Sequence, residues 1–281
     1  MEIQIIADSC CDLTPTLRRV LRVRTASLTI RVDDGEFIDD ENLDIPALMA
    51  AMKQSANAPT TACPAPEAYA AMMAQAPMTF VVTLSSRLSG SYNAACVGRD
   101  MALEADPSLK ICVLDSESAS AGETRIVMML RDLIDAGLAF EEIEQRARAF
   151  IAPMRTRFVL EDLSHLVKNG RISKMAGFVG TVLNLRPLMA DNGHGEIVCL
   201  EKIRGTANAM KKLVEHVAAE TADAARASIV LVLSYCNCAP RALELQKNLL
   251  ASCAALKDVI MVPTGGISTV YADDGGVVLA F

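Results

Sequence analysis

The sequence predicts an α/β protein with two lobes, on three observations. Its 281 residues exceed what one hydrophobic core usually spans. In the first half, short β-branched runs alternate with longer amphipathic segments, the order that builds a parallel sheet covered by helices. After about residue 153, short strands, glycine-broken helices and an Asn192-Gly193 turn replace this alternation. We therefore expect a Rossmann-like N-terminal parallel-sheet lobe over residues 1–153 and a C-terminal α+β lobe over residues 154–281.

The expected strands of the first lobe are short apolar runs. They lie at residues 3–7, 25–32, 79–84 and 111–114. Asp33-Asp34-Gly35 follows the second run and indicates a hairpin turn. Helices are expected where a cap or a proline precedes an amphipathic pattern. Asp12 or Thr14 would cap the first helix, and Asp44 the second. The later helices are expected at residues 66–76, 89–104, 119–136 and 139–152.

The second lobe has a mixed pattern. Strands are expected at residues 157–160 and 229–233 and from Leu188 and Ile197, with helices at residues 206–219 and 239–254. Residues 163–183 indicate short helices broken by glycines. The last segment, residues 258–281, is expected to form short strands.

Composition excludes several classes of function. The net charge is -7 and the basic residues are scattered, which disfavours nucleic acid as a partner. Aromatic residues make up 4% without any Trp, so base-stacking platforms are not expected. No apolar run approaches the roughly 20 residues of a membrane helix, and the N-terminus lacks a signal-peptide pattern. We expect a soluble, cytoplasmic protein. Cys236-Asn237-Cys238 has no second ligand pair, so no metal is expected.

Polar residues follow three of the predicted strands, as Asp8-Ser9, Ser85-Ser86 and Asp115-Ser116. The carboxyl ends of parallel strands share one edge of the sheet, where ligands bind. The sequence therefore predicts one crevice at this edge. We expect the acidic residues to cap helices or tie loops together, facing away from a bound anion.

Residues 84–92, LSSRLSGSY, place several hydroxyls between a strand and a helix. The Ser89-Gly90 pair is interpreted either as a helix N-cap or as a holder for an anion, because a helix start offers free N–H groups. Thr61 supplies a second hydroxyl just before a helix.

A serine nucleophile is the alternative interpretation. Ser86 or Ser89 would then act with one of the three histidines as a hydrolase of acyl esters. The chain has no G-x-S-x-G elbow, no phosphate-binding glycine loop and no H-E-x-x-H motif.

Six segments occur in an order and spacing that resemble the DegV family. They are IIADSCCDL, TTACP, LSSRLSGSY, VLDSESASAG, LVKNGRIS and KIRG. The resemblance extends from Ile5 to Phe281 and implies a two-lobed α/β protein that holds a long-chain fatty acid between its lobes. It also implies that the protein is not itself an enzyme and has no cofactor. Some members are the acyl-carrying subunit of a bacterial fatty acid kinase, whose ATP-binding partner phosphorylates the carboxylate.

By this resemblance, Thr61 and Ser89, with Gly90, hold the ligand carboxylate. The family's T-S-x-P-S is here Thr61-Ala62-Cys63-Pro64-Ala65, and Tyr271 stands where a histidine often touches the carboxyl group. A phenol still donates a hydrogen bond, but it carries no positive charge at neutral pH.

Binding of the acyl tail is expected to supply most of the affinity. At about 0.8 kcal/mol per buried CH₂, roughly sixteen carbons, the length of palmitate, give on the order of 12 kcal/mol before ordering costs. Arg171, with Lys202 and Arg204, is expected to edge the tunnel mouth and to help the phosphate donor or partner protein approach.

Overall fold

The computed structural model describes residues 3–172, 184–222 and 228–281, and the elements below are those of these ranges. Within them, no helix combines the length and apolar character that crossing a bilayer requires. The glycine-broken helices expected at residues 163–183 lie mostly outside the described residues. Their described beginning contains α7 (Ser164–Lys168).

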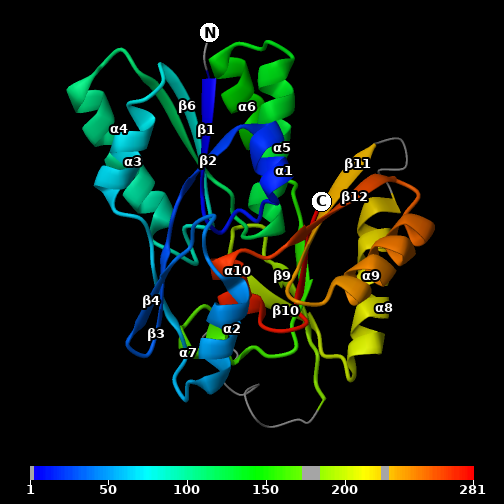
Figure 1. Cartoon of the computed structure of the whole chain (residues 1–281). Helices are drawn as coiled ribbons and strands as arrows, with labels where there is room; N and C mark the ends of the chain where they lie inside the picture. Colours follow the sequence, from blue (N-terminus) through cyan, green and yellow to red (C-terminus); the bar gives the residue numbers. More distant parts are fainter. Residues whose placement is uncertain (1–2, 173–183, 223–227) are drawn as a thin grey trace.

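The first half is built on a four-stranded parallel sheet (Figure 1). Its strand order is β2-β1-β6-β7, made of β1 (Ile3–Asp8), β2 (Val23–Ala26), β6 (Met78–Thr83) and β7 (Lys110–Asp115). Side chains alternate between the faces. Ile5 and Phe80 pack in one core cluster, whereas Ile6 and Val81 pack in another. Helices cover both faces, which explains why these strands read as continuous apolar runs.

Local capping signals decide where most of the flanking helices begin. These helices are α1 (Pro15–Leu21), α2 (Ile45–Gln54), α3 (Pro66–Met73), α4 (Ser91–Ala105), α5 (Ala121–Asp135) and α6 (Phe140–Ile151). Thr14 accepts a hydrogen bond from the Leu17 N–H, and Asp44 accepts one from the Ala47 N–H, which confirms both caps. The N-cap interpretation of Ser89 is wrong. Gly90, not Ser89, is the N-cap residue of α4, although the Ser89 hydroxyl accepts a hydrogen bond from the N–H of Ser91, the first residue of the helix, at 3.2 Å.

The continuous strand expected at residues 25–32 is also wrong. These residues form two strands, β2 and β3 (Thr29–Val32). Between them the Leu28 N–H donates to Ser9 Oγ instead of to a neighbouring strand, and the chain leaves the first sheet there. β3 pairs with β4 (Gly35–Ile38) through the expected turn, and with β5 (Thr60–Ala62) on its other side. The result is a small antiparallel sheet that holds Thr61.

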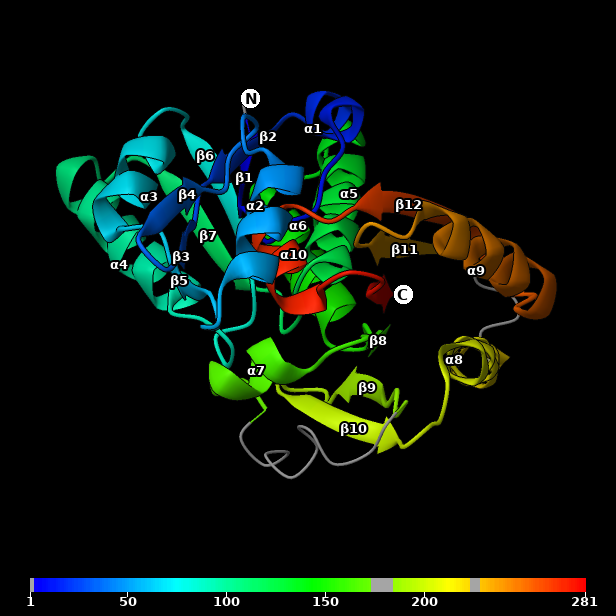
Figure 2. The same cartoon turned by 60° about the horizontal axis from the view of Figure 1, so that its bottom comes forward.

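The second half contains a six-stranded mixed sheet of order β10-β9-β8-β13-β11-β12. The strands are β8 (Thr156–Val159), β9 (Leu188–Asp191), β10 (Ile197–Glu201), β11 (Ile229–Tyr235), β12 (Leu256–Pro263) and β13 (Val277–Ala280). Only β11 and β12 pair in parallel within this described sheet, joined through α9 (Ala239–Ser252). Together with α8 (Thr206–Thr221), α9 packs over one face (Figure 2).

A helix, α10 (Gly266–Ala272), lies where only strands were expected. Its first N–H groups, on Gly266 and Ile267, donate to the carboxylate of Asp39 at 2.8 and 3.0 Å. Asp12 accepts from the Gly265 N–H at 2.7 Å. Acidic residues more than two hundred positions away therefore cap this helix, which local β-branched sequence conceals.

The two halves share a core around α10. Ile267 and Val270 pack with Leu28, Ile30 and Leu48 of the first half, and α10 lies beside α2 in both cartoons. A helix of the second half thus completes the wall that faces β5. The boundary between residues 153 and 154 stays a prediction.

Candidate functional site

An apolar cavity of about 110 Å³ lies between the two halves. Leu84 and Leu88 line it from the first half, and Phe158, Leu160 and Ile267 line it from the second. The crevice expected at the carboxyl ends of the parallel strands is therefore present, with the second half as its other wall.

The cavity runs along β8. Thr156, Phe158 and Leu160 all face it, whereas Val159 packs into the core behind the sheet. Alternate residues of this strand therefore form one wall of the cavity. Leu160 marks the end that continues into α7, and Thr156 marks the opposite end.

Two hydroxyls meet at the α7 end. Thr61 Oγ1 on β5 lies 3.0 Å from the phenol oxygen of Tyr271 on α10, and both side chains are half-buried. Tyr271 lines the cavity. Each hydroxyl has one hydrogen, and both can turn to donate to a carboxylate placed between them. Residues 210 positions apart thus form one candidate head-group site.

The Ser89-Gly90 turn lies beside the segment that follows Thr61. A Cβ atom on Gly90 would stand 3.3 Å from Cys63 Sγ, and Leu88, next to Ser89, lines the cavity. The Ser89 hydroxyl accepts from the Ser91 N–H at 3.2 Å, which leaves its own hydrogen for an acceptor.

Arg171 contributes the positive charge at this end of the cavity. Its Nε donates to the Leu88 carbonyl at 3.1 Å, and its guanidinium carbon is 5.8 Å from the centre of the Tyr271 ring. The side chain lines the cavity and is half-buried. A cation beside two hydroxyls favours an anionic group there.

Lys202 and Arg204 occupy a different place. Both are exposed, they follow β10, and neither is among the described residues that line the cavity. Unlike Arg171, these two residues do not line the cavity.

Buried acids brace the loops around the site, as expected. Asp8 accepts from the N–H groups of Cys10 and Leu84 and from the hydroxyl of Ser91, at 2.6–3.1 Å. Burial raises the pKa of Asp8. Burial, and then the neighbouring Asp8 charge, raise the pKa of Glu123 well above its usual value. Asp8 thereby binds both ends of the LSSRLSGS segment, at Leu84 and at Ser91, and it does not line the cavity.

The hydrolase alternative gains no support from the described residues. Within the described residues, neither the Ser86 nor the Ser89 hydroxyl bonds to a histidine. His165 Nδ1 lies 2.8 Å from the Val270 carbonyl oxygen, and His216 lies beside Glu201 and Glu220. His194 is exposed. A serine nucleophile needs a base within hydrogen-bond reach.

Sequence reasoning missed the role of Ser85. Its hydroxyl donates to the Gly195 carbonyl at 2.8 Å, across the two halves. Gly195 has a φ of +77°, and a Cβ atom there would overlap the Ser85 hydroxyl. The only sequence signal was a glycine in a turn. In the described part of the chain, no group of three His, Cys, Asp or Glu side chains could hold a metal ion.

Comparison with known proteins gives one consistent family. Residues 2–281 match the family model described as "Uncharacterised protein, DegV family". A DegV domain-containing protein of Streptococcus pneumoniae is 35% identical over 282 residues, covering 99% of this chain and 98% of that protein.

Solved structures agree with this assignment. A Ruminococcus gnavus protein of the DegV family, refined with vaccenic acid, has a TM-score of 0.92 at 36% identity, with 99% of each chain covered. The Fatty Acid Kinase (Fak) B3 protein of Streptococcus pneumoniae, loaded with linoleic acid, has a TM-score of 0.89 at 35% identity, with 100% of this chain and 99% of that chain covered. These matches extend over both halves of the fold, and this chain belongs to the DegV family.

Proposed function

We propose that this protein binds a long-chain fatty acid, with the tail in the cavity between its halves and the carboxylate at the α7 end. The observation that carries the proposal is the Thr61–Tyr271 hydroxyl pair at one end of an apolar cavity. The relatives from Ruminococcus gnavus and Streptococcus pneumoniae, which hold vaccenic and linoleic acid, support it. Binding of this kind uses no cofactor.

The proposed head-group site combines neutral donors with one cation. Thr61, Ser89 and Tyr271 donate hydroxyl hydrogens, and Arg171 supplies the positive charge that the phenol of Tyr271 lacks. Hydrogen bonds to a charged group contribute about 1.5–3 kcal/mol each, part of which offsets the cost of removing the carboxylate from water. The tail supplies the larger part of the affinity.

We further propose that the protein is a non-catalytic subunit that presents the carboxylate to an ATP-binding fatty acid kinase. The likeness to a protein named as a fatty acid kinase component supports this. Arg171 lies at the carboxylate end, whereas Lys202 and Arg204 are exposed and suited to contact a partner surface.

The test is a solvent extract of the purified protein, analysed by mass spectrometry. Fatty acid in stoichiometric amount is expected, with less in a Thr61→Val/Tyr271→Phe double variant. A clean extract, together with failure of the delipidated protein to bind any added fatty acid, contradicts the proposal. Labelling of a serine by a fluorophosphonate probe would instead favour the hydrolase.

A further inference from the structure

The end of the cavity opposite Tyr271 is polar. Ser118 and Thr156 both line it, and their side-chain oxygens are 2.6 Å apart. Only 4% of Ser118 and 7% of Thr156 is exposed, so water does not freely serve these hydroxyls. A tunnel built only for a hydrocarbon tail has no use for a buried hydroxyl pair where the tail ends.

Counting hydrogens shows that this pair can serve a further polar group. If Ser118 donates to Thr156, the Thr156 hydroxyl hydrogen has no acceptor among the described residues. If Thr156 donates to Ser118, the Ser118 hydrogen reaches only the Ala119 carbonyl, at 3.5 Å. In both arrangements, one donor lacks a good partner and is available to a group in the cavity.

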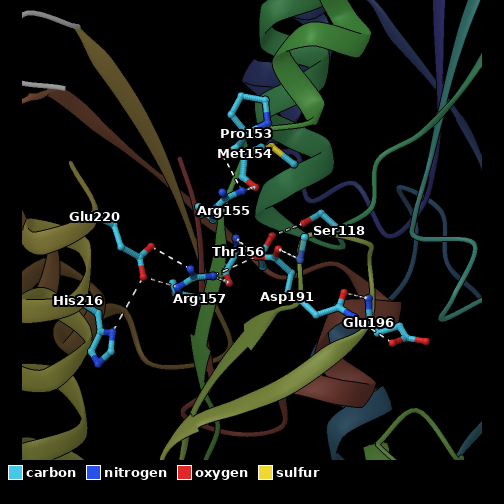
Figure 3. A network of polar contacts seen from close by, with 12 residues as sticks. Ser118, Pro153, Met154, Arg155, Thr156, Arg157, Asp191, Glu196, His216 and Glu220 are labelled. Carbon is cyan, nitrogen blue, oxygen red and sulfur yellow. Dashed lines mark hydrogen bonds and ion pairs between the residues drawn. The ribbon is translucent and has the colours of Figure 1, made fainter. Parts of the chain in front are cut away.

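The same end is held rigidly by ion pairs (Figure 3). Asp191 accepts from the Thr156 N–H at 2.6 Å and from Arg157 Nη1 at 3.0 Å. Arg157 also pairs with Glu220 at 2.9 Å. The Asp191–Arg157 pair is buried, with side-chain exposures of 9% and 8%, and it fixes the backbone from which the Thr156 hydroxyl projects.

Charge at this end excludes a second carboxylate on the ligand. Asp191, Glu117 and Glu196 line this part of the cavity, and Arg157 is already shared between two acids. The Cα atom of Glu117 is close to Gly195, next to Glu196, which places these acids together. A neutral group that both donates and accepts, such as an alcohol, meets no repulsion there.

We propose that the preferred ligand is a fatty acid with a hydroxyl group near its ω end. Its carboxylate lies at Thr61, Tyr271 and Arg171, and its hydroxyl bonds to the Ser118–Thr156 pair. This inference rests on the proposed function and names its substrate class. One end of the cavity carries a cation and the other carries acids and hydroxyls, so the two ends of the ligand are recognised by different chemistry.

Competition binding on delipidated protein tests the inference. The probes are hexadecanoic acid, 16-hydroxyhexadecanoic acid, its 12-hydroxy isomer and hexadecanedioic acid. One neutral hydrogen bond changes Kd by about 2- to 12-fold. The wild-type protein is therefore expected to bind the 16-hydroxy acid at least as tightly as the plain acid, and the 12-hydroxy and dicarboxylic acids at least about 10-fold more weakly.

Variants separate the hydroxyl pair from general effects. Thr156→Val and Ser118→Ala are expected to lower the affinity for the 16-hydroxy acid relative to hexadecanoic acid, measured on the same variant, by about 10-fold. Thr156→Ser should retain the preference. Thr83→Val is the matched control, because Thr83 is fully buried but does not line the cavity.

Two outcomes overturn the inference in different ways. If hexadecanoic acid binds tightly and the 16-hydroxy acid is rejected about 10-fold or more, the cavity end is not a hydroxyl site. The same conclusion follows if Thr156→Val leaves the order of the two acids unchanged. If neither acid binds to wild-type protein, the proposed function itself fails, and this inference fails with it.

Discussion

Replacing Tyr271 by phenylalanine removes one hydroxyl from the candidate head-group site and leaves the ring in place. In the free protein, the Tyr271 and Thr61 hydroxyls bond to each other at 3.0 Å. A bound carboxylate must break this bond, which costs about 1 kcal/mol, and then gains about 1.5–3 kcal/mol from each hydroxyl. The two hydroxyls of the wild-type protein therefore contribute a net of about 2–5 kcal/mol to the free energy of carboxylate binding.

The single and double variants should lose binding free energy in amounts that do not add up. Tyr271→Phe loses one donor but no longer has to break the pair, so its net loss is about 0.5–2 kcal/mol, or 2- to 30-fold in Kd. Thr61→Val should lose a similar amount. The double variant should lose about 1 kcal/mol of binding free energy, or fivefold in Kd, more than the two single losses added together. Each single variant is spared the cost of breaking the Thr61–Tyr271 bond, whereas the double variant is spared the same cost only once.

Isothermal titration with hexadecanoic acid measures this cycle on delipidated protein. Tyr235→Phe is the matched control, since Tyr235 does not line the cavity, and its Kd should equal that of the wild type. Unchanged Kd values for both single variants would show that the two hydroxyls do not hold the carboxylate. Strictly additive losses would refute the reasoning about the broken pair.

Three further changes test the contact between Ser85 and Gly195, the buried Asp12 and the proposed role of Arg171 toward a partner kinase. Gly195→Ala should lower the free energy of unfolding, measured in urea, by about 1–3 kcal/mol more than Gly193→Ala. Both glycines have a positive φ, but only Gly195 lies against a side chain of the first half, that of Ser85. Equal losses would contradict a stabilising contact between Ser85 and Gly195. Burial raises the pKa of Asp12 to about 6. Its folded form therefore keeps a proton that the unfolded chain releases above the ordinary value of 3.8, and about 3 kcal/mol of stability is lost as pH rises from 4 to 6. Urea unfolding across this range should show a shallower decline for Asp12→Asn than for the wild type, and equal declines would contradict the expectation. Arg171→Ala should weaken fatty acid binding, because the carboxylate loses its neighbouring cation while the tail still binds, and should slow acyl-phosphate formation by a fatty acid kinase at saturating fatty acid; equal rates for variant and wild type would refute the role in acyl-phosphate formation.

Local chemistry made much of the fold predictable. The strands of the parallel sheet are buried on both faces, so their apolar runs stand out, and the caps Thr14 and Asp44 act on helices that begin within three residues of them. Thr61 and Ser89 were named from motifs that resemble a family. Their order along the chain was enough for this, without knowledge of what they touch.

Other features depend on partners far away in the chain. Helix α10 begins where it does because Asp39, 227 residues before Gly266, accepts its first N–H. Tyr271 lies on that helix, so its hydrogen bond with Thr61 could not be predicted from the local sequence of either segment alone.

The sequence by itself determined the alternation of strands and helices, the scattering of basic residues along the chain and the hydroxyl-rich motifs, because each arises from composition or from neighbours a few residues apart. Only the tertiary structure decided that a cation and two hydroxyls share one end of an apolar cavity, and that Ser118 and Thr156 share the other. Contacts between residues tens or hundreds of positions apart depend on how the two halves pack, and no local pattern encodes that packing.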